Sequence, residues 1–460
     1  MWYHLLSALY FLIAVLLADF AMAALHWDEM TVKHTWNAVP ANWESQGNTT
    51  TGAMIKLHIA LKPDRESALI DALSEISNPG HSRHVLLTLL PCIYSRMPLR
   101  LRYGTYLSKE HVADLVRPPP DTLELVRGWL IHHGIKSSSI STALGGSWLT
   151  VTDMLVSQAN QLLGASYQVY RNSKTNKTII RTVGYSLPAV LHTHIRTVAP
   201  TTYFPSKQGI RQTPRRRPFG ESPEQAQEAS GKVVMARQDP GMTPSVLRWM
   251  YKTNSFWPAV PHQNMIGVLG FDDEYPSQLD LTQFMTRYRS EAERPTFTLV
   301  QWNGGNNQSN PGHVASVGIQ YTAAMTYPTM LTFYSVGGDT EWAPNGEPIA
   351  GDMYLEWFNN ILQEPFLPRT ISISYGHSEM DLPVDYAWPL CELFAELGVR
   401  GVSVLVASGI DGVGAGDCIN DEGNVQFIPE FPSSCTCGVL LPRNEKMAHP
   451  ATMVFRSLCH

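Results

Sequence analysis

Cysteine and histidine residues are the first candidates for chemistry in this chain of 460 residues. Its six cysteines lack the spacing of a zinc site, because Cys435 and Cys437 are separated by one residue where chelating pairs usually have two or more between them. We expect no metal site, and we interpret the cysteines as a source of one or two disulfides. His313 and His377 lie near the expected cleft, and we interpret them as surface or packing histidines rather than as parts of a rebuilt catalytic triad.

The second half of the chain alternates between two kinds of apolar pattern. Short apolar runs that predict buried strands lie at 265–271, 296–302, 330–336, 370–376 and 402–409. Helical stretches lie between most of them, at 313–325, 350–363 and 385–397. This order predicts a parallel sheet flanked by helices on both faces. Active sites of such folds lie at the carboxyl ends of the strands.

The first half has a mixed pattern over residues 31–204. Met54 to Leu61 alternates like a strand, and a helix is predicted from Asp64 through Ile76. Further helices and strands follow, with predicted helices at 108–115, 122–133 and 154–163 and predicted strands at 147–153, 167–171 and 178–186. The order favours a small α+β sandwich of the ferredoxin-like kind.

A segment rich in proline, glutamine and charge separates the two halves at 205–240, and we interpret it as a linker. It contains three consecutive arginines that end at Arg217. They are a processing site or a solvated basic run, and nucleic-acid binding is a third alternative that we favour least.

The N-terminus predicts secretion. Residues 1–23 combine an apolar stretch with the small residues Ala21 and Ala23, so we expect a signal peptide cleaved after Ala23. A membrane anchor is the alternative, but the apolar stretch is shorter than the roughly 20 residues that span a bilayer. Asn48, Asn176 and Asn307 begin sequons and are candidate glycosylation sites in an extracellular protein.

The charge balance limits the partners. A net charge of −6 leaves no overall basic field for nucleic acid or for an anionic membrane. We therefore expect peptides or proteins as ligands, no nucleic acid and no stable membrane insertion.

Several segments are specific enough to compare with known families. In the second half they are TPSVLRWMYK (243–252), GFDDEY (270–275), FTLVQWNGG (297–305), SISYGHSE (372–379), GVSVLVASGIDGVGAGDC (401–418) and FIPEFPSSC (427–435). In the first half they are YGTYLS (103–108), YQVYRN (167–172) and RTVGYSLPAVLHTHI (181–195). In this order they resemble the sedolisin family of secreted serine-carboxyl peptidases with a pro-kumamolisin-type propeptide. The resemblance implies an incomplete subtilisin-like peptidase domain at 241–435, preceded by a propeptide domain at 31–204.

The resemblance also implies which residues would do the chemistry. In this family a glutamate replaces histidine as the base that activates a serine, since a carboxylate still works in acid. Carried over by position, the base falls on Val314, its aspartate partner on Gly318 and the oxyanion aspartate on Ile410. None of these can ionise. Asp411 is one residue out of register and is expected to point elsewhere.

Two segments depart from the family pattern. Residues 436–460 carry no family feature, so the family's Gly-Thr-Ser nucleophile and its calcium site are missing from the sequence, and we expect no cofactor. This segment is either a translated intron or frame change, or a genuine tail. Residues 84–102 interrupt the propeptide pattern and are either a loop or retained non-coding sequence. Cys418 and Cys435 flank one loop and are predicted to form a disulfide.

Three functions remain open from the sequence. The first is a secreted, catalytically inactive homologue of an acid tripeptidyl-peptidase or endopeptidase. The second is an active peptidase of which this sequence is a truncated or mis-spliced version. The third is a binding module in which the propeptide domain acts as an inhibitor or chaperone.

Overall fold

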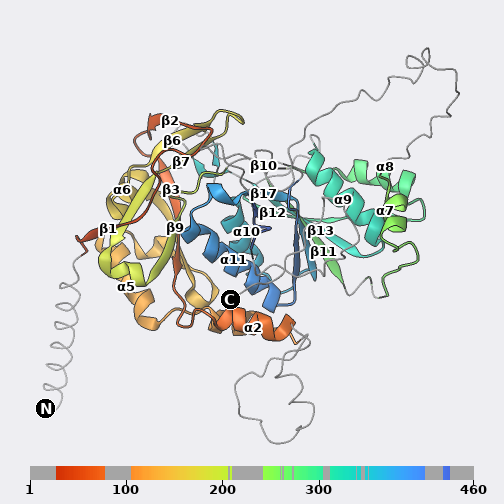
Figure 1. The fold of residues 1–460 in the computed structure, drawn as a ribbon, viewed down its shortest axis with the longest axis horizontal. Helices are drawn as coiled ribbons and strands as arrows, with labels where there is room; N and C mark the ends of the chain where they lie inside the picture. The colour runs from red at the N-terminus through yellow and green to blue at the C-terminus, as the bar shows by residue number, and fades with distance from the viewer. Residues whose placement is uncertain are drawn as a thin grey trace, which may run out of the picture.

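The computed structural model describes residues 27–77, 105–205, 208–209, 242–259, 261, 264–271, 274–303, 311–337, 339–342, 348–350, 352–409 and 428–435. The predicted signal peptide, the insertion at 84–102, nearly all of the linker and the tail lie outside these residues. The described residues form two α/β parts that lie side by side, with helices α10 and α11 between their sheets (Figure 1).

The first part consists of antiparallel strands and four described helices. Its strands are β1 (Met30–Thr35), β2 (Trp43–Asn48), β3 (Met54–Leu61), β4 (Ile140–Thr142), β5 (Trp148–Leu155), β6 (Gln168–Asn172), β7 (Thr178–Arg181), β8 (Gly184–Pro188) and β9 (Ile195–Ala199). Its helices are α2 (Ala68–Ser77), α4 (Lys109–Leu115), α5 (Pro120–His132) and α6 (Val156–Leu163). The central sheet has the order β4-β5-β3-β9 with antiparallel neighbours, and β2-β6-β7 and β1-β8 form smaller sheets.

The alternation of β3 gives its sheet two different faces. Ile55, Leu57 and Ile59 pack with α5 and α6 in a core that belongs to the first part alone. Lys56 and His58 project from the opposite face, toward α10. The polar positions of this strand therefore meet the second part of the chain and not open solvent.

Local signals explain several helix boundaries. The Ser108 hydroxyl accepts a hydrogen bond from the His111 amide and caps α4, and Pro120 occupies the first turn of α5. The predicted helix start at Asp64 is wrong, since α2 begins at Ala68. The Asp64 amide instead donates to the Arg117 carbonyl, which holds this residue outside the helix.

The second part contains the parallel sheet. Its strands are β10 (Gln208–Gly209), β11 (Met265–Gly270), β12 (Thr298–Trp302), β13 (Met330–Val336), β14 (Asp339–Trp342), β15 (Pro348–Ala350), β16 (Thr370–Ile373), β17 (Tyr375–Ser378), β18 (Ser403–Val406) and β19 (Glu430–Phe431). Its helices are α7 (Pro244–Met250), α8 (Gln278–Tyr288), α9 (His313–Thr326), α10 (Met353–Ile361) and α11 (Val384–Val399).

The predicted parallel sheet with helices on both faces is confirmed. Five strands run parallel in the order β12-β13-β11-β16-β18. Val268 and Phe333 point to one face and form a core with α8 and α9. Leu269 and Tyr334 point to the other face and pack with α10 and α11.

The two parts share hydrophobic cores. Ala60, Trp148 and Ala199 of the first sheet belong to the same buried cluster as α10, α11 and the parallel sheet. A second cluster joins α2 and α4 to the buried face of α11. The contact is close at Gly398, where a Cβ atom would lie 2.9 Å from a methyl group of Leu73.

Candidate active-site region and domain interface

The carboxyl end of β11 leads to a carboxylate that caps α9. Glu274 follows this strand, and its Oε2 atom accepts hydrogen bonds from the Val314 amide at 3.0 Å and the Ala315 amide at 3.3 Å. A negative charge is favourable here because the first amides of a helix are unpaired and carry partial positive charge.

Gly312 makes room for this cap. A Cβ atom at position 312 would lie only 1.8 Å from Oε2 of Glu274. Any side chain at 312 would therefore displace the carboxylate from the helix.

Val314 and Gly318 lie one turn apart on α9, as the i, i+4 spacing requires. Val314 is half-buried and packs against the core of the parallel sheet. A Cβ atom at Gly318 would lie 3.0 Å from a methyl group of Val268, so the helix lies close to β11 at this point. Neither Val314 nor Gly318 carries a group that can exchange a proton, and both lie against apolar side chains.

The loop after β18 is described only as far as Gly409. Gly409 has a positive φ of 79°, which favours glycine. A Cβ atom there would lie 2.0 Å from Oε1 of Glu430, so this carboxyl group lies directly against the loop. Ile410 and Asp411, the next residues, lie outside the described residues.

The two candidate histidines have different surroundings. His313 is exposed at the first turn of α9. His377 is buried in β17, with its ring 6.0 Å from the Tyr203 ring and 6.3 Å from the Tyr354 ring. His377 therefore lies in an aromatic packing environment.

The prediction that Cys418 pairs with Cys435 is wrong. Cys435 forms a disulfide with Cys391 of α11, with their Cα atoms 5.4 Å apart. The turn after β19 packs against α11, which brings together cysteines that are 44 positions apart. That Cys418 and Cys435 flank one loop in the sequence did not indicate this contact with α11. Cys418 lies outside the described residues.

The remaining predicted sites are placed as follows. Asn48 and Asn176 are exposed, as glycan acceptors need to be. Asn307, Arg217 and Ala23 lie outside the described residues. Within the described part of the chain, no cluster of three or more His, Cys, Asp or Glu side chains could hold a metal ion. In the same residues, no helix has the length and apolar character needed to cross a membrane.

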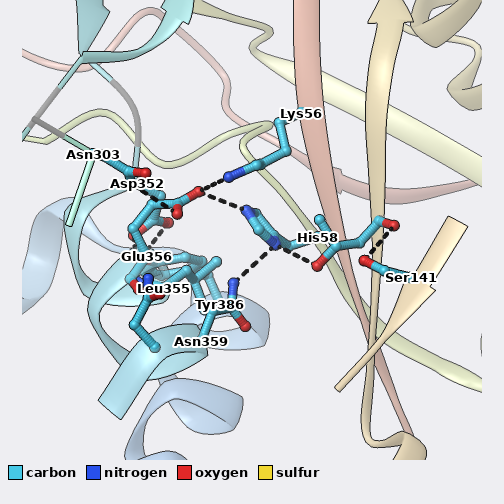
Figure 2. A network of polar contacts seen from close by, with 11 residues as sticks. Lys56, His58, Ser141, Asn303, Asp352, Leu355, Glu356, Asn359 and Tyr386 are labelled. Atoms are coloured by element: carbon cyan, nitrogen blue, oxygen red, sulfur yellow. Dashed lines mark hydrogen bonds and ion pairs between the residues drawn. The ribbon is translucent and has the colours of Figure 1, made fainter. Parts of the chain in front are cut away.

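A buried polar network connects the two parts of the chain (Figure 2). Glu356 of α10 is at its centre, with 5% of its side chain exposed. Its Oε1 accepts from Lys56 Nζ at 2.5 Å and lies 3.4 Å from His58 Nε2, while its Oε2 accepts from Asn303 Nδ2 at 2.9 Å. Lys56 and His58 come from β3 of the first part, so this carboxylate connects the two sheets through α10.

The contacts of His58 indicate its tautomer. Its Nδ1 atom lies 3.3 Å from the Asn359 amide nitrogen and 3.1 Å from the Thr150 hydroxyl, both of which can donate. If Nδ1 accepts these bonds, Nε2 carries the hydrogen and donates toward Glu356. Nε2 of His58 and the ammonium of Lys56 thus both face the Glu356 carboxylate.

The electrostatics of Glu356 follow from these contacts. Burial alone would raise the pKa of this carboxyl, but the hydrogen bond from His58, the charge of His58 and the ammonium of Lys56 together outweigh it and lower the pKa to about 2. Glu356 therefore remains ionised across the acidic range.

Asp352 and Tyr386 extend the network behind Glu356 (Figure 2). Asp352 caps α10 by accepting from the Leu355 amide at 3.1 Å, and it accepts from the Tyr386 hydroxyl at 2.6 Å. Burial raises the pKa of Asp352, although both hydrogen bonds oppose this effect. The pair ties the start of α10 to α11.

Glu396 of α11 is a second buried carboxyl at the interface with the first part. It lies between the two parts among Lys109, Trp148 and Arg400. Burial raises its pKa to about 8, and the nearby charge of Glu392 adds to the rise while Arg400 opposes it. This group is protonated in acid and ionises only near neutral pH.

Comparison with curated proteins places these features in a family. Tripeptidyl-peptidase SED2 of Arthroderma otae is 30% identical over 433 residues, which cover 91% of this chain and 68% of that protein. The chain belongs to the sedolisin family. The family assignment from the sequence motifs is confirmed.

Other matches agree with the sedolisin assignment. Residues 96–204 match the model of the pro-kumamolisin activation domain. The probable tripeptidyl-peptidase SED2 of Trichophyton verrucosum is 29% identical over 413 residues, covering 86% of this chain and 64% of that protein. This sedolisin-family chain thus spans about two thirds of the length of such relatives. One matching solved structure is a Pseudomonas sedolisin complexed with two molecules of pseudo-iodotyrostatin. The match covers 43% of this chain and 52% of the sedolisin chain at 15% identity, with a TM-score of 0.33.

The sequence motifs did not reveal the interface carboxyls of this sedolisin homologue. Glu356 and Glu396 each interrupt an apolar helical run, which is the one signal that could have marked them as buried and partnered. Lys56, the partner of Glu356, lies 300 positions away in the sequence. No local pattern predicts such a contact. Glu274 was part of a family motif, but its capping role depends on the fold.

Proposed function

We propose that this chain is a secreted, catalytically inactive sedolisin homologue in which a propeptide-type domain stays docked on the peptidase-type domain. The observation that carries the proposal is the α9 face. The resemblance assigns the family's base and its partner to Val314 and Gly318, and both positions lack a titratable side chain and lie against apolar ones. Without a proton acceptor a serine hydroxyl is a weak nucleophile.

In this proposal the nearby carboxyl groups do not replace the family's base and its aspartate partner. Glu274 uses its Oε2 to cap α9. Glu430 comes from a different segment and lies against Gly409. Removing one member of a catalytic set in a related serine peptidase already lowers turnover by several orders of magnitude. Because Val314, Gly318 and Ile410 replace three members of the set at once, we expect no turnover.

The test is hydrolysis of a tripeptide-blocked chromogenic substrate by the purified full chain at about pH 4, where a carboxylate base would work. We expect no turnover above the buffer rate. The Arthroderma otae relative, assayed beside it, is the positive control. Turnover by this chain that a serine-directed inhibitor abolishes would overturn the proposal and favour the active-peptidase alternative.

The first domain supports a second candidate function, that of an inhibitor or chaperone module. The strand order β4-β5-β3-β9 with antiparallel neighbours supports a ferredoxin-like fold for it, and it has a hydrophobic core of its own. Its other face contributes Ala60 and Trp148 to a core shared with α10 and α11. The test adds residues 27–205 to the Arthroderma otae peptidase. Inhibition supports the module, and unchanged activity at a large excess of a folded fragment argues against it.

A further inference from the structure

A pocket opens between the first domain and the start of α11. Its volume is about 520 Å³, within the range of small-ligand sites. The first domain supplies its basic side chains and α11 supplies its apolar ones, and the side chains that matter are Lys33, Lys62, Arg196, Asp385, Val384 and Trp388.

The basic side of the pocket has two ammonium groups that form no direct ion pair within the described residues. Lys33 Nζ donates to the Ile195 carbonyl at 3.0 Å, and within the described residues neither Lys33 nor Lys62 forms an ion pair. Burial lowers the pKa of Lys33, the charge of Asp385 opposes this, and the charge of Lys62 lowers it further. Two like charges therefore lie near one another in a partly buried site, an arrangement that an anion would relieve.

Asp385 and Glu66 also line the pocket. Asp385 Oδ2 accepts from the Tyr185 hydroxyl at 3.1 Å, whereas its Oδ1 is buried without a hydrogen-bond partner among the described residues. Arg196 pairs with Glu392 and lies 3.9 Å from Glu66. Lys33 and Lys62 are thus the cations of this pocket that form no ion pair within the described residues.

The opposite wall is apolar and exposed. Val384 and Trp388 lie one turn apart on α11, and they are 80% and 59% exposed. An exposed tryptophan beside unpaired lysines favours a ligand that carries a negative charge on an apolar body.

We propose that this pocket binds the C-terminal carboxylate of a short peptide whose last residue is apolar. The carboxylate contacts Lys33 and Lys62, and the last side chain packs on Val384 and Trp388. The inference goes beyond the proposed function, since binding at this pocket requires no hydrolysis. Because the ligand touches both domains, its binding stabilises their contact.

The experiment is isothermal titration calorimetry of the full chain with Ala-Ala-Phe, in parallel with its C-terminal amide and with acetate. At about pH 6 the peptide carboxylate is ionised. We expect binding of the free acid, at least about tenfold weaker binding of the amide, and no measurable heat with acetate. The thermal unfolding midpoint should rise with the free acid alone.

Two variants locate the site. Lys62→Met should weaken binding of the free acid about tenfold. The control is Lys174→Met, which replaces an exposed lysine in the turn between β6 and β7 and should not change the binding. Equal binding of acid and amide overturns the proposal, as does equal binding by the two variants or an absence of binding. Acetate binding as tight as the peptide shows a general anion site and also overturns it. The comparison of acid with amide uses the unmutated chain, so it decides the matter even if Lys62→Met does not fold.

Discussion

The buried carboxyl of Glu396 makes the stability of this protein depend on pH. Burial raises its pKa from 4.5 to about 8 in the folded chain. Stability from the bound proton is fully present below about pH 4.5 and is lost as the pH rises toward 8. At about pH 7.5 the loss of this stability corresponds to about three pKa units, or about 4 kcal/mol of unfolding free energy. At about pH 4 the loss is close to zero. Glu396→Gln removes this loss because the amide does not ionise.

The assay is urea unfolding followed by tryptophan fluorescence at about pH 4, 6 and 7.5. Wild type and Glu396→Gln should unfold at similar urea concentrations at the lowest pH, and the variant should become more stable by about 4 kcal/mol at the highest. Glu124→Gln, an exposed glutamate on α5, is the matched control and should follow wild type at each pH. A difference between wild type and Glu396→Gln that stays constant with pH would refute the reasoning.

Three further outcomes follow from described contacts. Lys56→Met should lower the unfolding free energy by about 3 kcal/mol, because it leaves the buried Glu356 carboxylate without its lysine partner. The depressed pKa of Glu356 gives stability that is present above about pH 4.5 and is lost as the pH falls toward about 2. The variant should therefore also unfold at a higher pH in an acid titration, and an unchanged acid midpoint would contradict this. Cys391→Ala opens a disulfide between cysteines 44 positions apart, which should lower the unfolding free energy by about 4 kcal/mol; equal urea midpoints for oxidised wild type and variant would count against the bond. Glu274→Ala should cost about 1 to 2 kcal/mol by uncapping α9, with faster amide exchange in its first turn as the local readout, and unchanged exchange there would argue against the cap.

Much of the architecture could be predicted because it depends on local periodicity. Buried parallel strands are continuous apolar runs, so each of the five strands of the parallel sheet has its own signal, and α9, α10 and α11 were predicted between them. The positions of Val314 and Gly318 on one face of α9 follow from helical spacing alone. The family motifs then placed these residues in a known order along the sheet.

Contacts between distant segments could not be predicted in the same way. The alternation of β3 marks Lys56 and His58 as one face of a strand, but an alternating pattern is the same whether the polar face meets water or another domain. The pairing of Cys435 with Cys391 depends on how the turn after β19 packs on α11, which no spacing reveals. The cap at Glu274 likewise requires that the loop after β11 and the start of α9 meet in space.

The hydrophobic core that Ala60 and Trp148 share with α10 and α11 has a consequence for processing of the chain. A backbone cut at Arg217 in the predicted linker would leave this core and the Lys56–Glu356 ion pair untouched. Within the described residues the disulfide lies wholly in the second part, so no described covalent bond joins the two products. A nicked molecule should therefore run as two bands on a reducing denaturing gel and elute as one heterodimer from a sizing column.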